Sequence, residues 1–194
     1  FRSGISGVKE NLGKGDDVKI MLHLAEGTKN DTFTWWFDEI TKRNVDFDII
    51  GLSFYTYWNG PISALKYNMD DISKRYNKDV IVVEAAYGYT TDNCDNAENN
   101  FTAKEAADAG YPATVQGQAD FLSDLMKSIV EVPDHRGKGI FYWEPAWLPT
   151  HGATWATKAG MKYNNDDWKE GNARENQALF DCQGHVLQSM KVFN

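Results

Sequence analysis

Four short apolar runs alternate with amphipathic segments along this chain of 194 residues. The runs cover residues 17–24, 48–54, 80–87 and 137–143. The third run begins with four consecutive β-branched residues and is too short for a buried helix. Runs of this kind predict strands that are covered on both faces, as in parallel sheets.

Helical periodicity fills the intervals between the strands. Residues 33–43 and 61–76 repeat apolar positions every three or four residues, and Pro61 suits the first turn of the second segment. Thr114 is expected to cap a third helix, whose apolar stripe consists of Phe121, Leu122, Leu125 and Ile129. Residues 1–10 have weaker helical spacing and end before Gly13 and Gly15.

Alternating buried strands and amphipathic helices predict a parallel sheet with crossover helices. Long polar segments, residues 88–113 and 148–173, follow strands, whereas short turns precede them. This asymmetry is typical of a (β/α)-barrel, in which function gathers at the carboxyl ends of the strands. A doubly wound open sheet is the alternative, but no glycine-rich phosphate loop follows any strand. We therefore predict an α/β fold that forms half of a (β/α)8 TIM barrel.

The predicted strand ends carry acidic and aromatic side chains. They are His23, Glu26, Tyr55, Tyr57, Trp58, Glu84, Tyr87, Trp143, Glu144 and Trp147. In a barrel these residues face one cleft. Carboxylates among aromatic rings, without a metal-binding cluster, are typical of glycoside hydrolysis, which uses paired carboxyl groups. The aromatic rings suit a sugar because the apolar face of a pyranose stacks on them.

Each of these residues also has a purely structural interpretation. His23 could be hydrogen-bonded within the core, and Glu84 could cap a helix or face water. The three aromatic residues at 55, 57 and 58 could pack under a loop. Trp143 could fill the barrel mouth, and Glu144 could pair with a neighbouring base. Together, however, they favour a catalytic cleft.

Composition narrows the classes of partner. The formal charge of −8 and the lack of a Lys/Arg cluster argue against nucleic acid and acidic membrane surfaces. No apolar run approaches the roughly 18 residues that a membrane span needs. Cys94 and Cys182 lack metal-ligand spacing, and two well-separated cysteines are more often free than bridged.

Six sequence blocks, in this order, resemble glycoside hydrolase family 53, the arabinogalactan endo-β-1,4-galactanases of the clan A barrels. They are His-Leu-Ala-Glu-Gly at 23–27, Phe-Thr-Trp-Trp-Phe-Asp at 33–38, Ile-Gly-Leu-Ser-Phe-Tyr-Thr-Tyr-Trp at 50–58, Val-Val-Glu-Ala-Ala-Tyr at 82–87, Tyr-Trp-Glu-Pro-Ala-Trp at 142–147 and Glu-Asn-Gln-Ala-Leu-Phe-Asp at 175–181. The resemblance spans essentially the whole chain. It implies strands five to eight of one catalytic barrel domain over residues 1–194.

The resemblance also implies residue roles. Glu84 matches the strand-seven nucleophile of a retaining mechanism, and Trp143 matches the strand-eight aromatic residue that floors the cleft. The expected substrate-binding residues are His23, Tyr55, Tyr57, Trp58, Tyr87, Trp143, Glu144 and Trp147. The family's acid/base, a Glu preceded by Asn, has no counterpart because the chain contains no Asn-Glu pair. We therefore expect the acid/base upstream of residue 1, no galactan hydrolysis by residues 1–194 alone, and a partner that is the N-terminal half-barrel or a second copy.

Chemistry in this family requires no cofactor, but some members bind a structural calcium at the loop after strand seven. The resemblance places Asn93, Asp95 and Asn99 on ligand positions, whereas Ala97 replaces a ligating His. A solvated loop with Asx turns is the alternative. A cell-wall polymer substrate implies a secreted or cell-envelope enzyme. The competing functions are a non-catalytic carbohydrate-binding protein and another clan A β-glycanase.

Overall fold

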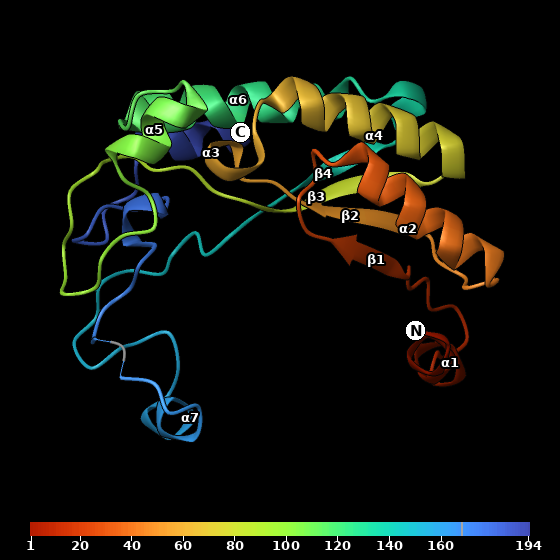
Figure 1. Cartoon of the computed structure of the whole chain (residues 1–194), viewed down its shortest axis with the longest axis horizontal. Helices are drawn as coiled ribbons and strands as arrows, with labels where there is room; N and C mark the ends of the chain where they lie inside the picture. The colour runs from red at the N-terminus through yellow and green to blue at the C-terminus, as the bar shows by residue number, and fades with distance from the viewer. Residues whose placement is uncertain (168) are drawn as a thin grey trace. The chain divides into compact units, whose positions relative to one another are not determined.

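The computed structural model describes residues 1–167 and 169–194, and Figure 1 shows the order of their elements. The strands are β1 (Met21–Leu24), β2 (Ile49–Ser53), β3 (Asp79–Ala85) and β4 (Gly137–Tyr142). The α-helices are α1 (Arg2–Glu10), α2 (Asn30–Lys42), α3 (Thr56–Asn59), α4 (Ile62–Tyr76), α5 (Ala103–Ala109), α6 (Val115–Val130) and α7 (Lys158–Tyr163). The short 3-10 helices are η1 (Pro133–His135), η2 (Glu175–Gln177) and η3 (Gln188–Phe193).

The four strands form one sheet in the order β1-β2-β3-β4. β1 pairs with β2 in parallel, and β2 pairs with β3 in parallel. Since α2 lies between β1 and β2 in the chain, and α4 between β2 and β3, each helix is a crossover connection of the kind that parallel strands require. The sheet matches the predicted half of a (β/α)8 barrel, and β1 and β4 are its edge strands.

By its internal contacts the chain divides into two compact units, which we describe separately. The first comprises residues 1–54, 61–85 and 126–141, and the second comprises residues 55–60, 86–125 and 142–194. The prediction of one domain over residues 1–194 therefore stays a prediction.

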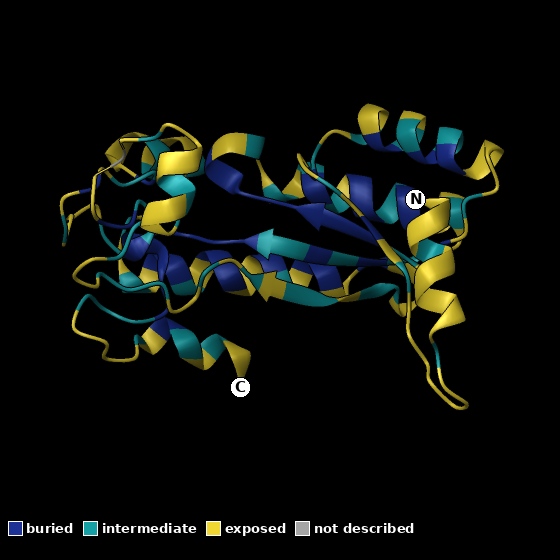
Figure 2. Ribbon diagram, turned by 90° about the horizontal axis from the view of Figure 1, so that it is seen from below, coloured by how far each residue is buried: buried dark blue, intermediate teal, exposed yellow. Residues whose placement is uncertain are grey.

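The first unit packs α2 and α4 against one face of the sheet (Figure 1). Its core is formed by Phe33, Phe37, Ile40, Leu65, Met69, Ile72, Ile50, Leu52, Val80 and Val82. These side chains are almost fully buried, and their helical members recur at intervals of three or four residues. Figure 2 shows the buried positions along the strands and on the helix sides that face them.

The second unit has an aromatic core. Tyr87, Phe101 and Phe121 are fully buried and their rings are in contact. The stripe predicted for α6 is confirmed, since Phe121, Leu122 and Leu125 in this unit and Ile129 in the first unit are all buried. Gln118, also on α6, donates hydrogen bonds to the carbonyl oxygens of Tyr87 and Ala178 and ties the loop after β3 to the C-terminal segment.

Three short helices are absent from the sequence prediction. α5 and α7 lie in segments expected to be irregular, and α3 follows β2 directly. α5 begins with a capping box. The Thr102 side chain accepts a backbone N–H of the first turn, and the Glu105 carboxylate accepts the Thr102 backbone N–H. The predicted strand over 17–24 begins four residues before β1, and the other three predicted strands end one or two residues after β2, β3 and β4, where Phe54, Tyr87 and Trp143 continue the apolar pattern. None of the described helices is long and apolar enough to cross a membrane.

Candidate active site

The candidate nucleophile, Glu84, lies one residue before the carboxyl end of β3. The register of β2 and β3 shifts beside it, because Leu52 is paired with Val82 but Ser53 is paired with Glu84. Val83 is therefore an extra residue, a β-bulge. Without the bulge, strict alternation would place Glu84 on the helix-covered face with the fully buried Val80 and Val82. The bulge turns the carboxylate to the other face, a use that bulges have next to active sites.

Gly51 leaves space for His23 on that other face. His23 on β1 is the register partner of Gly51 on β2. A Cβ atom added to Gly51 would lie 3.3 Å from the His23 Cβ and 3.2 Å from a methyl group of Val83. Because glycine fills none of this space, the His23 imidazole extends across β2 toward β3. Its Nε2 lies 4.0 Å from Glu84 Oε1.

Ser53 at the end of β2 completes this group, and sequence analysis did not identify it. Its side chain is buried, and its Oγ lies 2.7 Å from His23 Nε2. The Ser53 carbonyl oxygen accepts the Gly27 N–H at 2.8 Å, which fixes the backbone at this strand end. The first unit thus brings together His23, Ser53 and Glu84, whereas Glu26 is exposed after β1.

The second unit brings together the three aromatic residues that follow β2. Tyr55, Tyr57 and Trp58 have ring centroids 4.9–5.8 Å apart. The guanidinium of Arg174, another residue missed in the sequence, lies 5.4 Å from the Tyr55 ring and 5.8 Å from the Trp58 ring. Trp58 is half-exposed, so its ring is available to a ligand.

Two of the predicted substrate-binding tyrosines have packing roles in this structure. The Tyr57 hydroxyl donates to Gln177 Oε1 at 2.5 Å, and the Tyr87 hydroxyl donates to the Tyr111 carbonyl at 2.6 Å. Burial raises the pKa of both phenols, that of Tyr87 to about 12, so both donate as neutral hydroxyls at neutral pH. Contact with substrate stays a prediction for these residues.

Trp143 and Glu144 come directly after β4, and both are solvent-accessible. Glu144 has a left-handed backbone with φ of 52°, which is uncommon for a residue other than glycine. Trp147 lines a pocket of about 330 Å³ with Trp155 and Arg174, among others. The indole N–H of Trp155 donates to Asp166 at 3.1 Å. This pocket therefore has an aromatic and charged lining.

The predicted calcium ligands lie in the loop after β3, where Asx turns are present. Asn93 Oδ1 accepts the Asp95 N–H, and Asp95 Oδ1 accepts the Ala97 N–H, each from two residues further on. The other Asp95 oxygen accepts the Asn172 N–H at 2.7 Å. Asn93 and Asp95 therefore form Asx turns, and their assignment as calcium ligands stays a prediction.

Glu175 adds a carboxyl group to this loop that sequence analysis did not assign to it. Its Oε1 accepts the Cys94 N–H at 2.5 Å and lies 3.4 Å from Asn99 Nδ2. Burial, together with the neighbouring Asp95 carboxyl, raises the pKa of Glu175 to about 7. Glu175 Oε2 and Asn99 Oδ1 are buried and have no hydrogen-bond partner.

This oxygen-only set fits a calcium ion, which prefers carboxylate and amide oxygens. Two buried acceptors without partners, beside a pair of adjacent carboxyls, are the features that a divalent cation would satisfy. Within residues 1–167 and 169–194, no three His, Cys, Asp or Glu side chains form a metal cluster, so amide oxygens would have to contribute. Asn93 Oδ1 already accepts the Asp95 N–H at 3.3 Å, so it would be a weaker ligand than the unpartnered Asn99 Oδ1.

Cys94 and Cys182 form a disulfide, which corrects the expectation of free thiols. Their Cα atoms are 6.3 Å apart although 88 positions separate them in sequence. Spacing in the sequence could not reveal this pairing, because the fold brings the loop after β3 beside the C-terminal segment. The bridge fixes this loop next to the Glu175 carboxyl group.

Breaking the disulfide is expected to lower the free energy of unfolding by about 2–4 kcal/mol, since the bridge restricts the unfolded chain across a long loop. Urea denaturation of the oxidised protein and of a Cys94→Ser/Cys182→Ser variant measures this difference. Dithiothreitol should destabilise the native protein and leave the double variant unchanged. Equal stability of native and variant proteins would contradict the prediction.

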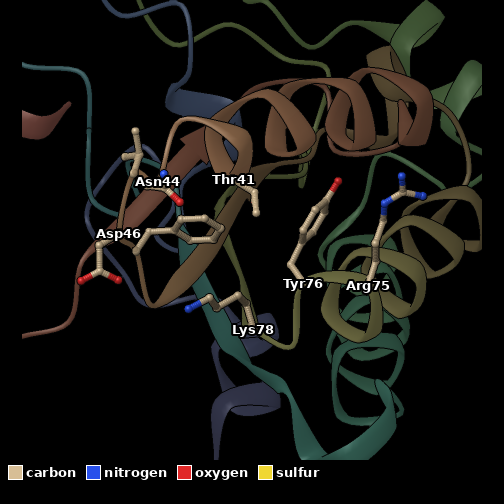
Figure 3. A pocket seen from close by; sticks show the side chains of 8 residues that line it. Thr41, Asn44, Asp46, Arg75, Tyr76 and Lys78 are labelled. Atoms are coloured by element: carbon tan, nitrogen blue, oxygen red, sulfur yellow. The ribbon is translucent and has the colours of Figure 1, made fainter.

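A pocket of about 440 Å³ in the first unit lies at the wrong end of the strands for catalysis (Figure 3). Its lining includes Phe47, which precedes β2, and Lys78, which precedes β3, whereas Glu84 lies at the opposite end of β3. Its other charged residues are neutralised, because Arg75 pairs with Asp38 and Asp46 pairs with Lys9. We attribute a stabilising role to this region, as at the amino-terminal face of barrels generally.

A parallel strand–helix sheet in this order is half of a (β/α)8 barrel, the class of fold whose enzymes carry their catalytic groups at the carboxyl ends of the strands. The sequence model of Glycosyl hydrolase family 53 matches residues 1–193, and the chain belongs to this family.

Similar proteins agree with this assignment. The chain is 31% identical to the endo-beta-1,4-galactanase of Bacillus subtilis (strain 168), covering all of this chain and 48% of that protein. It is 37% identical to an uncharacterized protein in the bgaB 5' region of Niallia circulans, over 97% of this chain and 48% of that protein. The solved GH53 catalytic domain of Ignisphaera aggregans superposes with a TM-score of 0.88 at 38% identity, covering all of this chain and 50% of that domain. The chain thus spans about half the length of these proteins.

Proposed function

We propose that this chain is the C-terminal half of a retaining endo-β-1,4-galactanase, with Glu84 as the nucleophile. The single observation that carries the proposal is the bulge that turns Glu84 toward His23 at the carboxyl end of β3, in a chain of family 53. Relatives named endo-beta-1,4-galactanase support the substrate class. We call the assembly of residues 1–194 with the N-terminal half of the domain the intact barrel.

In the proposed first step a Glu84 carboxylate oxygen attacks the anomeric carbon of a galactosyl unit. The bond from that carbon to the leaving sugar oxygen breaks, and a glycosyl-enzyme ester forms. The departing oxygen takes a proton from an acid/base Glu in the N-terminal half. A separation of about 5–5.5 Å between the two carboxyl groups would suit retention. Water then hydrolyses the ester, and the acid/base Glu removes the water proton.

Aromatic residues would hold the galactan chain. Trp58, Trp143 and Trp147 are accessible enough for stacking on pyranose faces. A plant cell-wall polymer cannot enter a cell intact, so we also propose a secreted or cell-envelope location. The N-terminal half-barrel, or a second copy of this chain, would pair with the edge strands β1 and β4, because unpaired strand edges invite association.

We also propose a structural calcium ion held by Asp95, Asn99 and Glu175, with Asn93 contributing least. When bound, the ion would neutralise adjacent carboxyls and pin the loop after β3 to the C-terminal segment. The support is the pair of unpartnered buried oxygens at Asn99 and Glu175.

Calcium is expected to raise the melting temperature of the intact barrel, and EDTA to lower it. At a free calcium concentration one hundred times the dissociation constant, the stabilisation would be about 2.7 kcal/mol. Glu175→Gln and Asn99→Ala should abolish the response measured by differential scanning fluorimetry. Asp92→Asn, an exposed carboxylate in the same loop, is the matched control and should retain it. A melting curve of the native protein that EDTA leaves unchanged would refute the calcium site.

The function is tested by incubating the intact barrel with β-1,4-galactan, mannan and β-glucan. We expect hydrolysis of galactan alone, with internal cuts seen as a rapid fall in viscosity. Proton NMR of the first products should show the β-anomer, as retention requires. Hydrolysis of mannan or glucan instead would identify another β-glycanase, and binding of galactan without cleavage would identify a carbohydrate-binding protein.

A further inference from the structure

We propose that Ser53 is a positioning residue that acts on the Glu84 nucleophile through His23. The proposal rests on the proposed function, because it assigns Glu84 the nucleophilic role. It adds Ser53 to the residues that sequence analysis identified at the strand ends. Ser53 would orient the imidazole, and the imidazole would orient the carboxylate.

Ser53 is the polar exception in a strand whose other residues are apolar, Ile49-Ile-Gly-Leu. Its side chain is 5% exposed, and a buried hydroxyl needs a hydrogen-bond partner. His23 Nε2 at 2.7 Å is that partner. The Ser53 backbone is fixed by the Gly27 N–H and by pairing with β3. The hydroxyl is therefore a rigid reference point at the strand end.

The His23 ring would have freedom to rotate without this contact. Its side chain is 37% exposed, and Gly51 leaves the space beside it open on β2. The bond to Ser53 selects one ring orientation, in which the imidazole packs beside the Glu84 carboxylate. Nε2 lies 4.0 Å from Glu84 Oε1, which is longer than a direct hydrogen bond, so the ring limits the directions open to the carboxylate by contact.

A carboxylate nucleophile must point at the anomeric carbon when the substrate is bound. Misplacing a reacting group by about 1 Å can cost about 100-fold in rate. An imidazole held beside Glu84 can therefore affect the rate at which the glycosyl-enzyme forms. Glu84 belongs to a bulged strand end, where its carbonyl oxygen accepts the Phe54 N–H at 2.7 Å and its backbone pairs with Ser53. The Ser53–His23 pair would add a side-chain contact beside the carboxylate.

The test isolates the step that Glu84 performs. The substrate is 2,4-dinitrophenyl 2-deoxy-2-fluoro-β-galactobioside, whose leaving group departs without protonation. A Glu84 oxygen bonds to the anomeric carbon, the bond from that carbon to the phenolate oxygen breaks, and its electron pair leaves with dinitrophenolate. The fluorine slows hydrolysis of the ester, so mass spectrometry of the intact barrel follows its formation. Peptide mapping identifies Glu84 as the labelled residue.

Ser53→Ala is expected to slow this step by about 10–100-fold without changing the apparent substrate affinity. Ser53→Thr, which keeps the hydroxyl, should restore most of the rate. In a His23→Ala background, Ser53→Ala should have no further effect, since Ser53 acts through His23. Ser73→Ala is the matched control, because Ser73 is also buried but bonds to the Asp70 carbonyl on α4. It should label at the native rate.

Each outcome discriminates between the proposals. Absence of label on Glu84 in the native protein would refute the proposed function. Native labelling with an unchanged rate in Ser53→Ala, or multiplicative effects of the two substitutions, would refute the positioning role alone. If Ser53→Ala does not fold, nitrogen-15 NMR of the His23 ring in Ser53→Thr decides the matter. One tautomer, as in the native protein, supports the positioning role, and a tautomer mixture in both proteins overturns it.

Discussion

Glu84→Gln in the intact barrel is expected to reduce galactan hydrolysis on the order of 10⁴-fold or more, as loss of a covalent nucleophile does in other enzymes. The amide keeps the size of the side chain but cannot form the glycosyl ester. Reducing-sugar release from galactan measures the loss. Because glutamine has the same size and Glu84 is partly accessible, the substitution should leave the melting temperature nearly unchanged.

Azide gives a second readout for the same residue. Glu84→Gly opens space for azide beside the anomeric carbon, and the expected product from an activated β-galactoside is the α-galactosyl azide. Glu131→Gln, an exposed acid that follows α6, is the matched control and should be fully active. Native-like turnover by Glu84→Gln would transfer the nucleophilic role to another carboxylate.

Residues 1–194 alone are expected to hydrolyse galactan at least about 10²–10⁴-fold more slowly than the intact barrel. This range is the usual contribution of general acid catalysis, and the chain contains no Asn-Glu pair that would match the family's acid/base. The measurement compares equal molar amounts of the two proteins on galactan. Ordinary turnover by residues 1–194 would show that the proton donor lies within them.

Low activity of residues 1–194 could result from misfolding or from the missing acid/base Glu, and a co-expression experiment separates these two causes. Co-expression with the N-terminal half should restore activity if pairing along β1 and β4 is what residues 1–194 lack. When that half carries a Gln in place of its acid/base Glu, galactan hydrolysis should stay low. The dinitrophenyl substrate should then still label Glu84, because its leaving group needs no proton.

Much of the fold can be predicted from the sequence, because the spacing of apolar residues indicates which positions are buried. The run at 48–54 contains β2, the run at 80–87 covers all of β3 except its first residue, and the stripe from Phe121 to Ile129 lies on α6. Strand-end placement of Glu84 also follows, since an acid that ends a buried apolar run must lie at the rim of the sheet.

The arrangement around Glu84 could not be predicted in the same way. A bulge depends on the register between two strands, which the sequence of either strand alone does not contain. The Ser53–His23 bond spans 30 positions, and the only local signal was a polar residue within an apolar strand. Glu175 lies 76 positions from Asn99, so nothing nearby in the chain connects it with the loop after β3.

Val83 makes the proposed chemistry depend on a count of residues as well as on their identity. Residues on a strand alternate between faces, so the parity of the interval between the buried valines and Glu84 decides which way the acid turns. Deleting one aliphatic residue here would keep every acidic and aromatic group yet point the carboxylate at the helices. Homologues that lack this single insertion would therefore be catalytically inactive, although their sequences would contain every acidic and aromatic residue of the site.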